Sequence, residues 1–119
     1  TVVQPSTTLP HPLPDELVEL MARRFRVLGE PTRIRLVDRL REGEASVGEL
    51  TEALGATQQN VSKHLGLLTE ARVLARRKGG NRVYYRIADE AVLALCEEVC
   101  GSLRQQLHAL NELVQGLDA

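Results

Sequence analysis

Along most of this chain, apolar side chains recur at spacings of three and four residues. Such spacing places them on one face of an α-helix, whereas alternation at every second residue indicates a β-strand. The helical pattern runs from residue 14 to residue 71 and again after residue 89, and alternation occurs only between them, at Val73–Arg77 and Arg82–Ile87. The chain is therefore predicted to be mainly α with a small two-stranded β-hairpin, in the order α-α-α-α-β-β-α.

Glycine and proline mark the ends of the first two predicted helices. Pro14 suits the first turn of a helix that runs to Leu28 and ends at Gly29. Pro31 opens a second helix, which ends by Gly43. The apolar side chains available for burial on these helices are Leu17, Val18, Leu20, Met21, Phe25, Leu28, Ile34, Leu36, Val37 and Leu40.

The third and fourth helices are short and are separated by Gly55. Ser46 and Glu49 form a capping box at the start of the third helix, because each side chain can bind the backbone of the other. Thr57 is a suitable cap for the fourth helix. The inward face of that helix is predicted to hold Val61, Leu65 and Leu68, and its other face to display Gln58, Gln59, Asn60, Ser62, Lys63 and His64.

Basic charge gathers in and after the fourth helix. Residues 56–88 hold seven basic side chains and one acidic, a net +6, whereas residues 89–119 hold one basic and six acidic, a net −5. The whole-chain charge of −1, taken alone, argues against nucleic-acid binding. However, the basic side chains remain concentrated in residues 56–88 even though the total is near zero. A glycine turn at Lys78–Asn81 joins the two strands. An exposed polar helix beside a basic hairpin predicts binding to double-stranded DNA.

The last predicted helix carries a long apolar stripe. Asp89 is a good N-cap for this helix, and the pattern continues for about 25 residues. The stripe is Val92, Leu95, Val99, Leu103, Leu107, Leu110, Val114 and Leu117. One small domain has too little surface to cover it, so we expect it to pack against the first helix of a second copy in a homodimer. Residues 1–14, rich in Thr and Pro, are expected to be a mobile arm ahead of one domain at 15–119.

Three blocks of sequence resemble the ArsR/SmtB family of winged helix-turn-helix transcriptional repressors. They are Leu28–Arg35, Gln59–Leu65 and Gly80–Ile87, and they occur in the family's order and spacing. The resemblance implies a symmetric dimer, formed through the first and last helices, that occupies an operator. It also implies release from the operator by an effector, often a metal ion.

The candidate DNA-contacting residues lie on the fourth helix and the hairpin. Side-chain amides in the first turn of the helix can pair with adenine edges, and basic side chains suit phosphates. His64 is included as an exposed side chain that either contacts DNA or has no role. A two-fold dimer predicts a palindromic operator with half-sites ~34 Å apart. The full set is Thr57, Gln58, Gln59, Asn60, Ser62, Lys63, His64, Lys78, Asn81 and Arg82.

The metal sites implied by the resemblance lack their ligands in this chain. A Cys-x-Cys pair at the start of the third helix would fall on Ser46 and Gly48. A second set, on the last helix, matches at Asp89, but its other positions fall on Ala91, Ser102 and Gln105. We therefore expect neither site, and Asp89 to act only as a helix cap.

Cys96 and Cys100 are the remaining candidate ligands. Four residues apart on a helix, their Cβ atoms lie about 5–6 Å apart, too far for an unstrained disulfide. Two thiolates can share one soft ion at about 2.3 Å by rotamer choice alone. The resemblance adds that some family members sense arsenite through cysteines on this helix. A thiophilic ion such as As(III) is the predicted effector, its third ligand left open among His11, Glu97 and a residue of the partner subunit.

Other interpretations of the cysteines remain open from sequence. The pair suits a thiol redox or reactive-sulfur switch, and two small apolar side chains beside a dimer surface can also serve packing alone, with a different signal or none. A protein-interaction module is the rival class for the fold, but it would favour acidic or apolar residues where the fourth helix has Gln58 and Lys63.

The sequence offers little for catalysis or for membranes. It shows no nucleophile with a base, phosphate loop or carboxylate pair, so we do not expect an enzyme. No stretch approaches the roughly 20 apolar residues of a membrane span, and no signal peptide is evident. Two cysteines do not make a disulfide scaffold, so the expected location is the cytoplasm.

Overall fold

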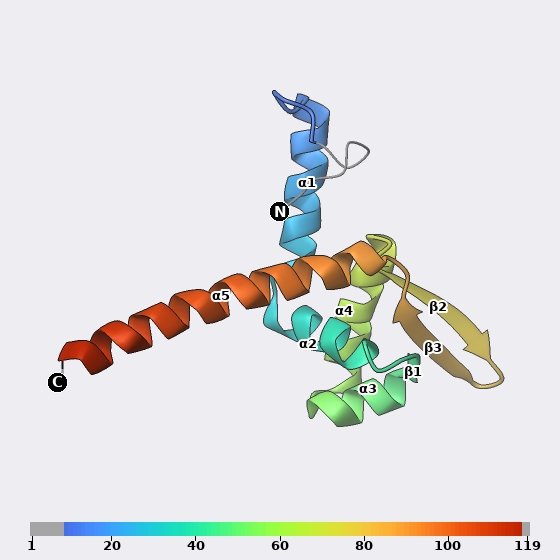
Figure 1. Cartoon of the computed structure of the whole chain (residues 1–119). Helices are drawn as coiled ribbons and strands as arrows, with labels where there is room; N and C mark the ends of the chain where they lie inside the picture. The colour runs from blue at the N-terminus through green and yellow to red at the C-terminus, as the bar shows by residue number, and fades with distance from the viewer. Residues whose placement is uncertain (1–8, 118–119) are drawn as a thin grey trace.

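The structure is a computed structural model that describes residues 9–117. Its elements follow the predicted order, with one short strand added: α1 (Asp15–Leu28), α2 (Pro31–Leu40), β1 (Ala45–Ser46), α3 (Val47–Leu54), α4 (Gln58–Glu70), β2 (Leu74–Gly79), β3 (Arg82–Ile87) and α5 (Glu90–Leu117) (Figure 1). The mainly α architecture with a β-hairpin is thus confirmed. Residues 1–8 of the expected arm lie outside the described residues, and residues 9–14 form neither helix nor strand.

The predicted helix caps are present as hydrogen bonds. Ser46 Oγ accepts from the Glu49 amide at 3.2 Å, and Glu49 Oε1 accepts from the Ser46 amide at 3.0 Å. Thr57 Oγ1 accepts from the Asn60 amide at 3.2 Å and caps α4. Each bond satisfies an amide that has no partner inside its helix, so these local contacts fix where the helices begin.

The small sheet has three strands in the order β1-β3-β2. The unexpected member is β1, whose two residues pair antiparallel with Tyr84 and Tyr85 of β3. Two residues are too few to show alternation, which is why sequence patterns miss this strand. The turn is also tighter than predicted, because pairing runs to Gly79 and Arg82 and leaves only Gly80 and Asn81 between the strands. Gly80 has φ 63°, a left-handed value that suits glycine.

The core lies where α2, α3 and α4 meet the sheet. Its fully buried large side chains are Leu36, Val37, Leu50, Val61, Leu65, Leu68, Val73 and Leu74. Each is aliphatic, and burying one such side chain contributes about 1.5–3 kcal/mol relative to leaving it exposed. Through its buried side chains α4 packs against α2, α3 and the sheet, and the first turn of α4 faces outward.

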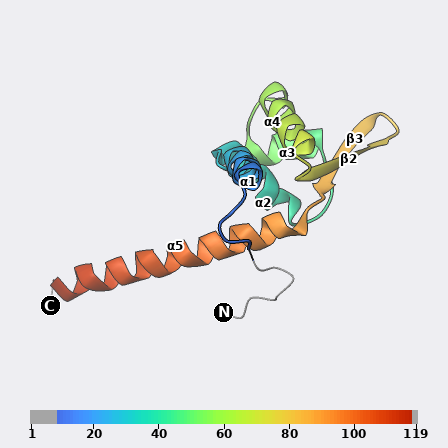
Figure 2. The same ribbon diagram turned by 90° about the horizontal axis from the view of Figure 1, so that it is seen from above.

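Helices α1 and α5 project away from this core (Figures 1 and 2). Val92, near the start of α5, is buried, but the rest of the predicted stripe from Val99 to Val114 is exposed. Val18, Leu20 and Phe25, which the pattern made available for burial, and Ile34, which was expected to face inward, are exposed as well. The reason is that no other element of the same chain covers these faces. Within residues 9–117, no helix is both long and apolar enough to cross a membrane.

Candidate nucleic-acid interface and thiol pair

The exposed face of α4 carries most of the predicted DNA-contacting residues. Thr57, Gln58, Gln59, Asn60, Ser62 and Lys63 are all exposed, while Val61, Leu65 and Leu68 lie in the core. Gln58 of α4 and Asn81 and Arg82 of the hairpin line one hollow of about 560 Å³, together with the start of α3. The fold thus brings the helix and the hairpin tip, far apart in sequence, onto one surface.

His64 does not belong to that surface. Its exposed fraction is 8%, and its Nδ1 lies 3.1 Å from Arg33 Nη1 and 3.7 Å from Glu30 Oε2. The expectation that His64 is exposed on the outer face of the helix is therefore wrong. Positions 61, 64, 65 and 68 are spaced as one helix face, so periodicity itself carried the signal for burial.

The β2–β3 hairpin, hereafter the wing, is tied to the body by an arginine that sequence reasoning did not single out. Arg77 donates to both carboxylate oxygens of Glu44 at 2.7 Å, and its guanidinium lies 4.5 Å from the centre of the Tyr84 ring. The hydrogen bond from Arg77 lowers the pKa of the Glu44 carboxyl. Within residues 9–117, by contrast, Lys78 and Arg82 form no ion pair, and both side chains are exposed.

Asp89 is not only a helix cap, as the sequence had predicted, because it also links the first and last helices. Its Oδ1 accepts from the Ala91 amide at 3.0 Å, which confirms the predicted cap, and its Oδ2 accepts from Arg24 Nη1 at 2.9 Å. Arg24 also donates to the Ala71 carbonyl at 3.4 Å. The hydrogen bond from Arg24, supported by the Ala91 amide, lowers the pKa of the Asp89 carboxyl.

Asp89→Asn should therefore destabilise the fold at neutral pH and have less effect in acid. Because the pKa of Asp89 is lower in the folded than in the unfolded protein, its stabilisation is present above the unfolded pKa of about 3.9 and is lost as pH falls through the folded pKa. For a partly exposed pair the loss at pH 7 should be about 1 kcal/mol or less. Thermal unfolding of both proteins between pH 7 and 2.5 measures this. A stability difference that does not shrink in acid, or that also appears in Asp15→Asn, would contradict it.

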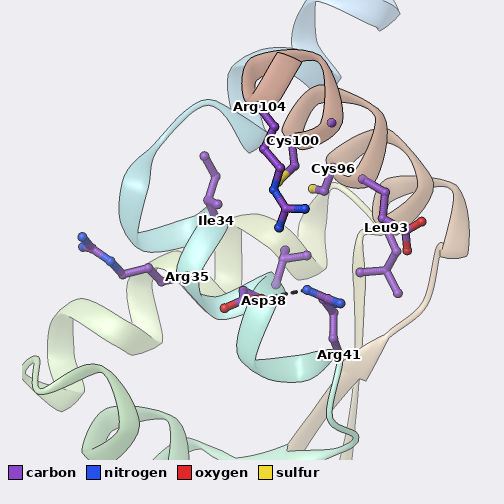
Figure 3. A pocket seen from close by; sticks show the side chains of 11 residues that line it. Ile34, Arg35, Asp38, Arg41, Leu93, Cys96, Cys100 and Arg104 are labelled. Atoms are coloured by element: carbon purple, nitrogen blue, oxygen red, sulfur yellow. Dashed lines mark hydrogen bonds and ion pairs between the residues drawn. The ribbon is translucent and has the colours of Figure 1, made fainter. Parts of the chain in front are cut away.

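The two thiols lie on α5 where it crosses α2. Cys96 is half-buried and Cys100 is exposed, and neither is in a disulfide. Both line a pocket of about 470 Å³ with Asp38 of α2, Arg41 just after α2, and Arg104 of α5. In Figure 3 both side chains lie on the face of α5 that is turned toward α2. Their side-by-side placement matches the prediction from their spacing.

Burial raises the pKa of the Cys96 thiol, and the Asp38 carboxylate adds to the effect while Arg41 opposes it. The thiol is therefore protonated at neutral pH, and a metal must displace the proton to bind. In the part of the chain that the structure describes, no three His, Cys, Asp or Glu side chains group closely enough to hold a metal. Neither His11 nor Glu97 therefore completes a site with the thiols inside one chain.

The thiols also border the uncovered apolar surface. Cys96 and Cys100 line a second groove, of about 540 Å³, whose walls are otherwise almost entirely apolar. Phe25 of α1, Ile34 of α2 and Leu103 of α5 contribute to it and are each about half exposed. A ligand on the thiols would therefore sit at the edge of the surface expected to pack against a second copy.

Comparison with known proteins agrees with the geometry. Residues 28–77 match the family described as "Helix-turn-helix domain". The chain is 40% identical over 86 residues to the transcriptional regulator KmtR of Mycobacterium tuberculosis, covering 72% of this chain and 66% of KmtR. It is 40% identical over 82 residues to the repressor SmtB of the same species, covering 69% and 61%. It is also 33% identical over 89 residues to the biofilm growth-associated repressor of Agrobacterium fabrum, covering 75% and 76%.

The chain belongs to the ArsR/SmtB family. This family assignment confirms the resemblance seen in the sequence. The chain spans 61–66% of the length of the first of these relatives, KmtR and SmtB. The matched proteins are transcriptional regulators and repressors, not enzymes, as expected from the absence of a catalytic constellation.

Solved structures of ArsR/SmtB-type proteins share the fold. The antimony-specific repressor AntR matches with a TM-score of 0.75 and 29% identity, over 91% of this chain and 98% of AntR. The homodimeric winged helix-turn-helix domain of Mb0332 from Mycobacterium bovis matches with a TM-score of 0.71 and 30% identity, over 77% of this chain and 85% of that domain. The winged helix-turn-helix prediction is thereby confirmed.

Proposed function

We propose that this protein is a homodimeric repressor that binds a palindromic operator and leaves it when a thiophilic metalloid or metal ion binds Cys96 and Cys100. One observation carries the proposal: the two thiols lie together at the edge of an uncovered apolar surface in an ArsR/SmtB fold. A ligand there is placed to alter how two subunits pack, and subunit packing sets the spacing of the two α4 helices, the reading helices that would contact DNA.

The DNA-binding half of the proposal is supported by the surface around α4 and the wing. Gln58, Gln59 and Asn60 are exposed in the first turn of α4, where their amides can reach base edges in the major groove. Lys63 on α4 and Arg82 on the wing extend this surface with positive charge for phosphates. In a two-fold dimer these surfaces would read half-sites about one DNA turn, ~34 Å, apart.

The dimer is supported by the apolar faces that the single chain leaves uncovered. Leu103, Leu107 and Leu110 are more than half exposed on α5, and Phe25 is 53% exposed on α1. A contiguous apolar surface of this kind marks an interaction site. The homodimeric state of the Mb0332 domain supports a second copy of this chain as the partner.

The effector is supported by the donor set. Two thiols are soft ligands that favour soft ions over magnesium or calcium. Within residues 9–117 of one chain no third protein ligand lies near the two thiols. The third ligand would therefore come from the partner subunit. The similarity to AntR, a repressor specific for antimony, supports a trivalent metalloid such as arsenic or antimony as the ion. A coupling free energy of ~1–3 kcal/mol between ion and DNA binding suffices for release.

Binding of the wild-type protein to DNA from the region upstream of its own gene tests the proposal. Fluorescence anisotropy should show tight, salt-sensitive binding to this duplex and weak binding to a scrambled duplex. Arsenite, antimonite, cadmium, zinc and a persulfide donor are then added in turn, and a metalloid should release the protein at the lowest concentration. Equal affinity for both duplexes would contradict the repressor, and release by persulfide alone or by no ligand would contradict the metalloid effector.

Glu44→Gln should strengthen DNA binding at low salt. The change leaves the Arg77 guanidinium without its carboxylate partner, so the wing gains a free positive charge. One additional phosphate contact should steepen the dependence of log affinity on log salt by about 0.9. Anisotropy titrations at several salt concentrations measure the slope. Glu19→Gln, which removes an exposed carboxylate from α1, is the matched control. An unchanged slope in Glu44→Gln would mean that Arg77 does not reach DNA.

A further inference from the structure

Arg33 stands at the meeting point of three helices. It lies in the first turn of α2, and its Nε donates to the carbonyl of Val27 while its Nη2 donates to that of Arg26 at 3.5 Å. These carbonyls belong to the last turn of α1, where backbone acceptors have no partner inside the helix. On its other side, Arg33 Nη1 lies 3.1 Å from Nδ1 of His64 on α4. One guanidinium thus joins the end of α1 to the middle of α4.

The contact with Arg33 defines which ring nitrogen of a neutral His64 carries the proton. A guanidinium carries only hydrogen-bond donors, so Nδ1 of His64 must be the acceptor and the proton of the neutral imidazole must sit on Nε2. Glu30 caps the start of α2, since its Oε2 accepts from the backbone amide of Arg33 at 3.0 Å, and the same oxygen lies 3.7 Å from Nδ1 of His64. The histidine is buried, so this bond is protected from competition by water.

The same turn of α2 also faces the thiols. Ile34, the residue after Arg33, lines both grooves that Cys96 and Cys100 line. Phe25, one residue before the carbonyls that Arg33 binds, lines the apolar groove as well. The start of α2 and the end of α1 therefore contact the thiol-bordered surface on one side and α4 on the other.

From these contacts we propose that Arg33, acting through His64, is a positioning residue that sets the orientation of the reading helix α4 relative to α1. This inference rests on the proposed function. Its physical basis is that α1 and α4 share one rigid, three-way hydrogen-bonded side chain. A shift of α1 at the subunit interface would move the Arg26 and Val27 carbonyls and, through the arginine, His64. Such a link carries the ligand signal to α4 without a contact between the thiols and DNA.

Two substitutions at position 64 separate positioning from packing. His64→Leu fills the buried space with an apolar side chain but removes the hydrogen-bond acceptor. His64→Asn places an amide oxygen, which is also an acceptor, close to where Nδ1 lies. His64→Leu should bind the upstream duplex roughly tenfold more weakly, the order expected for loss of one hydrogen bond to a charged group. It should bind a scrambled duplex as wild type does and remain dimeric by sedimentation, and His64→Asn should regain the lost affinity.

A spectroscopic measurement complements the affinities. In nitrogen-15 NMR spectra the wild-type imidazole should show the Nε2–H tautomer, and Arg33→Lys, which cannot reach all three acceptors, should lose this signature and the preference for the operator together. Operator affinity unchanged in His64→Leu, or no recovery in His64→Asn, would overturn the inference while leaving the proposed function intact. A wild-type protein that does not prefer its upstream duplex would overturn the proposed function and this inference with it.

Discussion

Leu103→Glu is expected to turn the dimer into a monomer and to weaken operator binding by roughly 100-fold or more, because two linked reading helices bind a palindrome far more tightly than one. Leu103 lies in the middle of the exposed stripe of α5, and its exposed fraction in the single chain is 52%. In a dimer packed through this stripe, a carboxylate at position 103 would be buried without a partner, which is strongly unfavourable. Sedimentation equilibrium and anisotropy titration measure the two effects.

The matched control for this change is Gln105→Glu. It adds the same charge two residues further along α5, and at about 100° per residue it lies on the opposite side of the helix from the stripe. The control should remain dimeric and bind the operator as wild type does. Because Leu103 is exposed in the single chain, Leu103→Glu should keep its helical content. A dimer that survives Leu103→Glu would mean that the subunits do not pack through this stripe.

The double variant Cys96→Ser/Cys100→Ser is expected to bind the operator as wild type does and to remain bound when the metalloid is added. Serine is close to cysteine in size, and Cys100 is exposed, so the fold and dimer should persist. Its hydroxyl is a poor ligand for a soft ion, so the coupling of ~1–3 kcal/mol between metalloid and DNA should fall to zero. Anisotropy titration of the protein–DNA complex with arsenite or antimonite measures release directly.

The dependence of release on pH adds a second readout for the thiols. Burial raises the pKa of Cys96, so this thiol is protonated below that pKa and the ion must displace its proton. Release by a divalent ion such as cadmium, which drives the thiol proton into solvent, should therefore require less ligand as pH rises toward the thiol pKa, and more as it falls. Release by arsenite or antimonite should depend little on pH, because their hydroxide groups leave as water together with the thiol protons. Ser102→Ala, on the same helix, is the control and should respond as wild type does. Full release of the double serine variant would show that the effector binds elsewhere and that the cysteines serve packing.

Local features of the fold were predictable because their causes lie within a few residues of one another. The capping box at Ser46 and Glu49, the cap at Thr57 and the cap at Asp89 each depend on a side chain and an amide two or three residues away. The short strand β1 was missed because its existence depends on Tyr84 and Tyr85, almost 40 residues along the chain.

The candidate site also combines features that follow from local spacing with contacts between residues distant in sequence. The helical period predicts that α4 displays its side-chain amides and Lys63. The spacing of four predicts that Cys96 and Cys100 lie on the same face of α5. The pairing of Arg77 with Glu44 spans 33 residues and that of His64 with Arg33 spans 31, and no periodicity reports such contacts. Arg77, which the sequence did not single out, is therefore paired with Glu44, and a histidine predicted to be exposed is buried.

The sequence by itself determined the order of helices and strands, the reading face of α4, the thiol pair and the apolar stripe, because each is encoded by spacing along one element. Only the tertiary structure decided which charged side chains form ion pairs, and that α1 and α5 leave their apolar faces uncovered in a single chain. These properties depend on which elements pack together. Packing is governed by contacts between residues distant in sequence, whose partners no local pattern specifies.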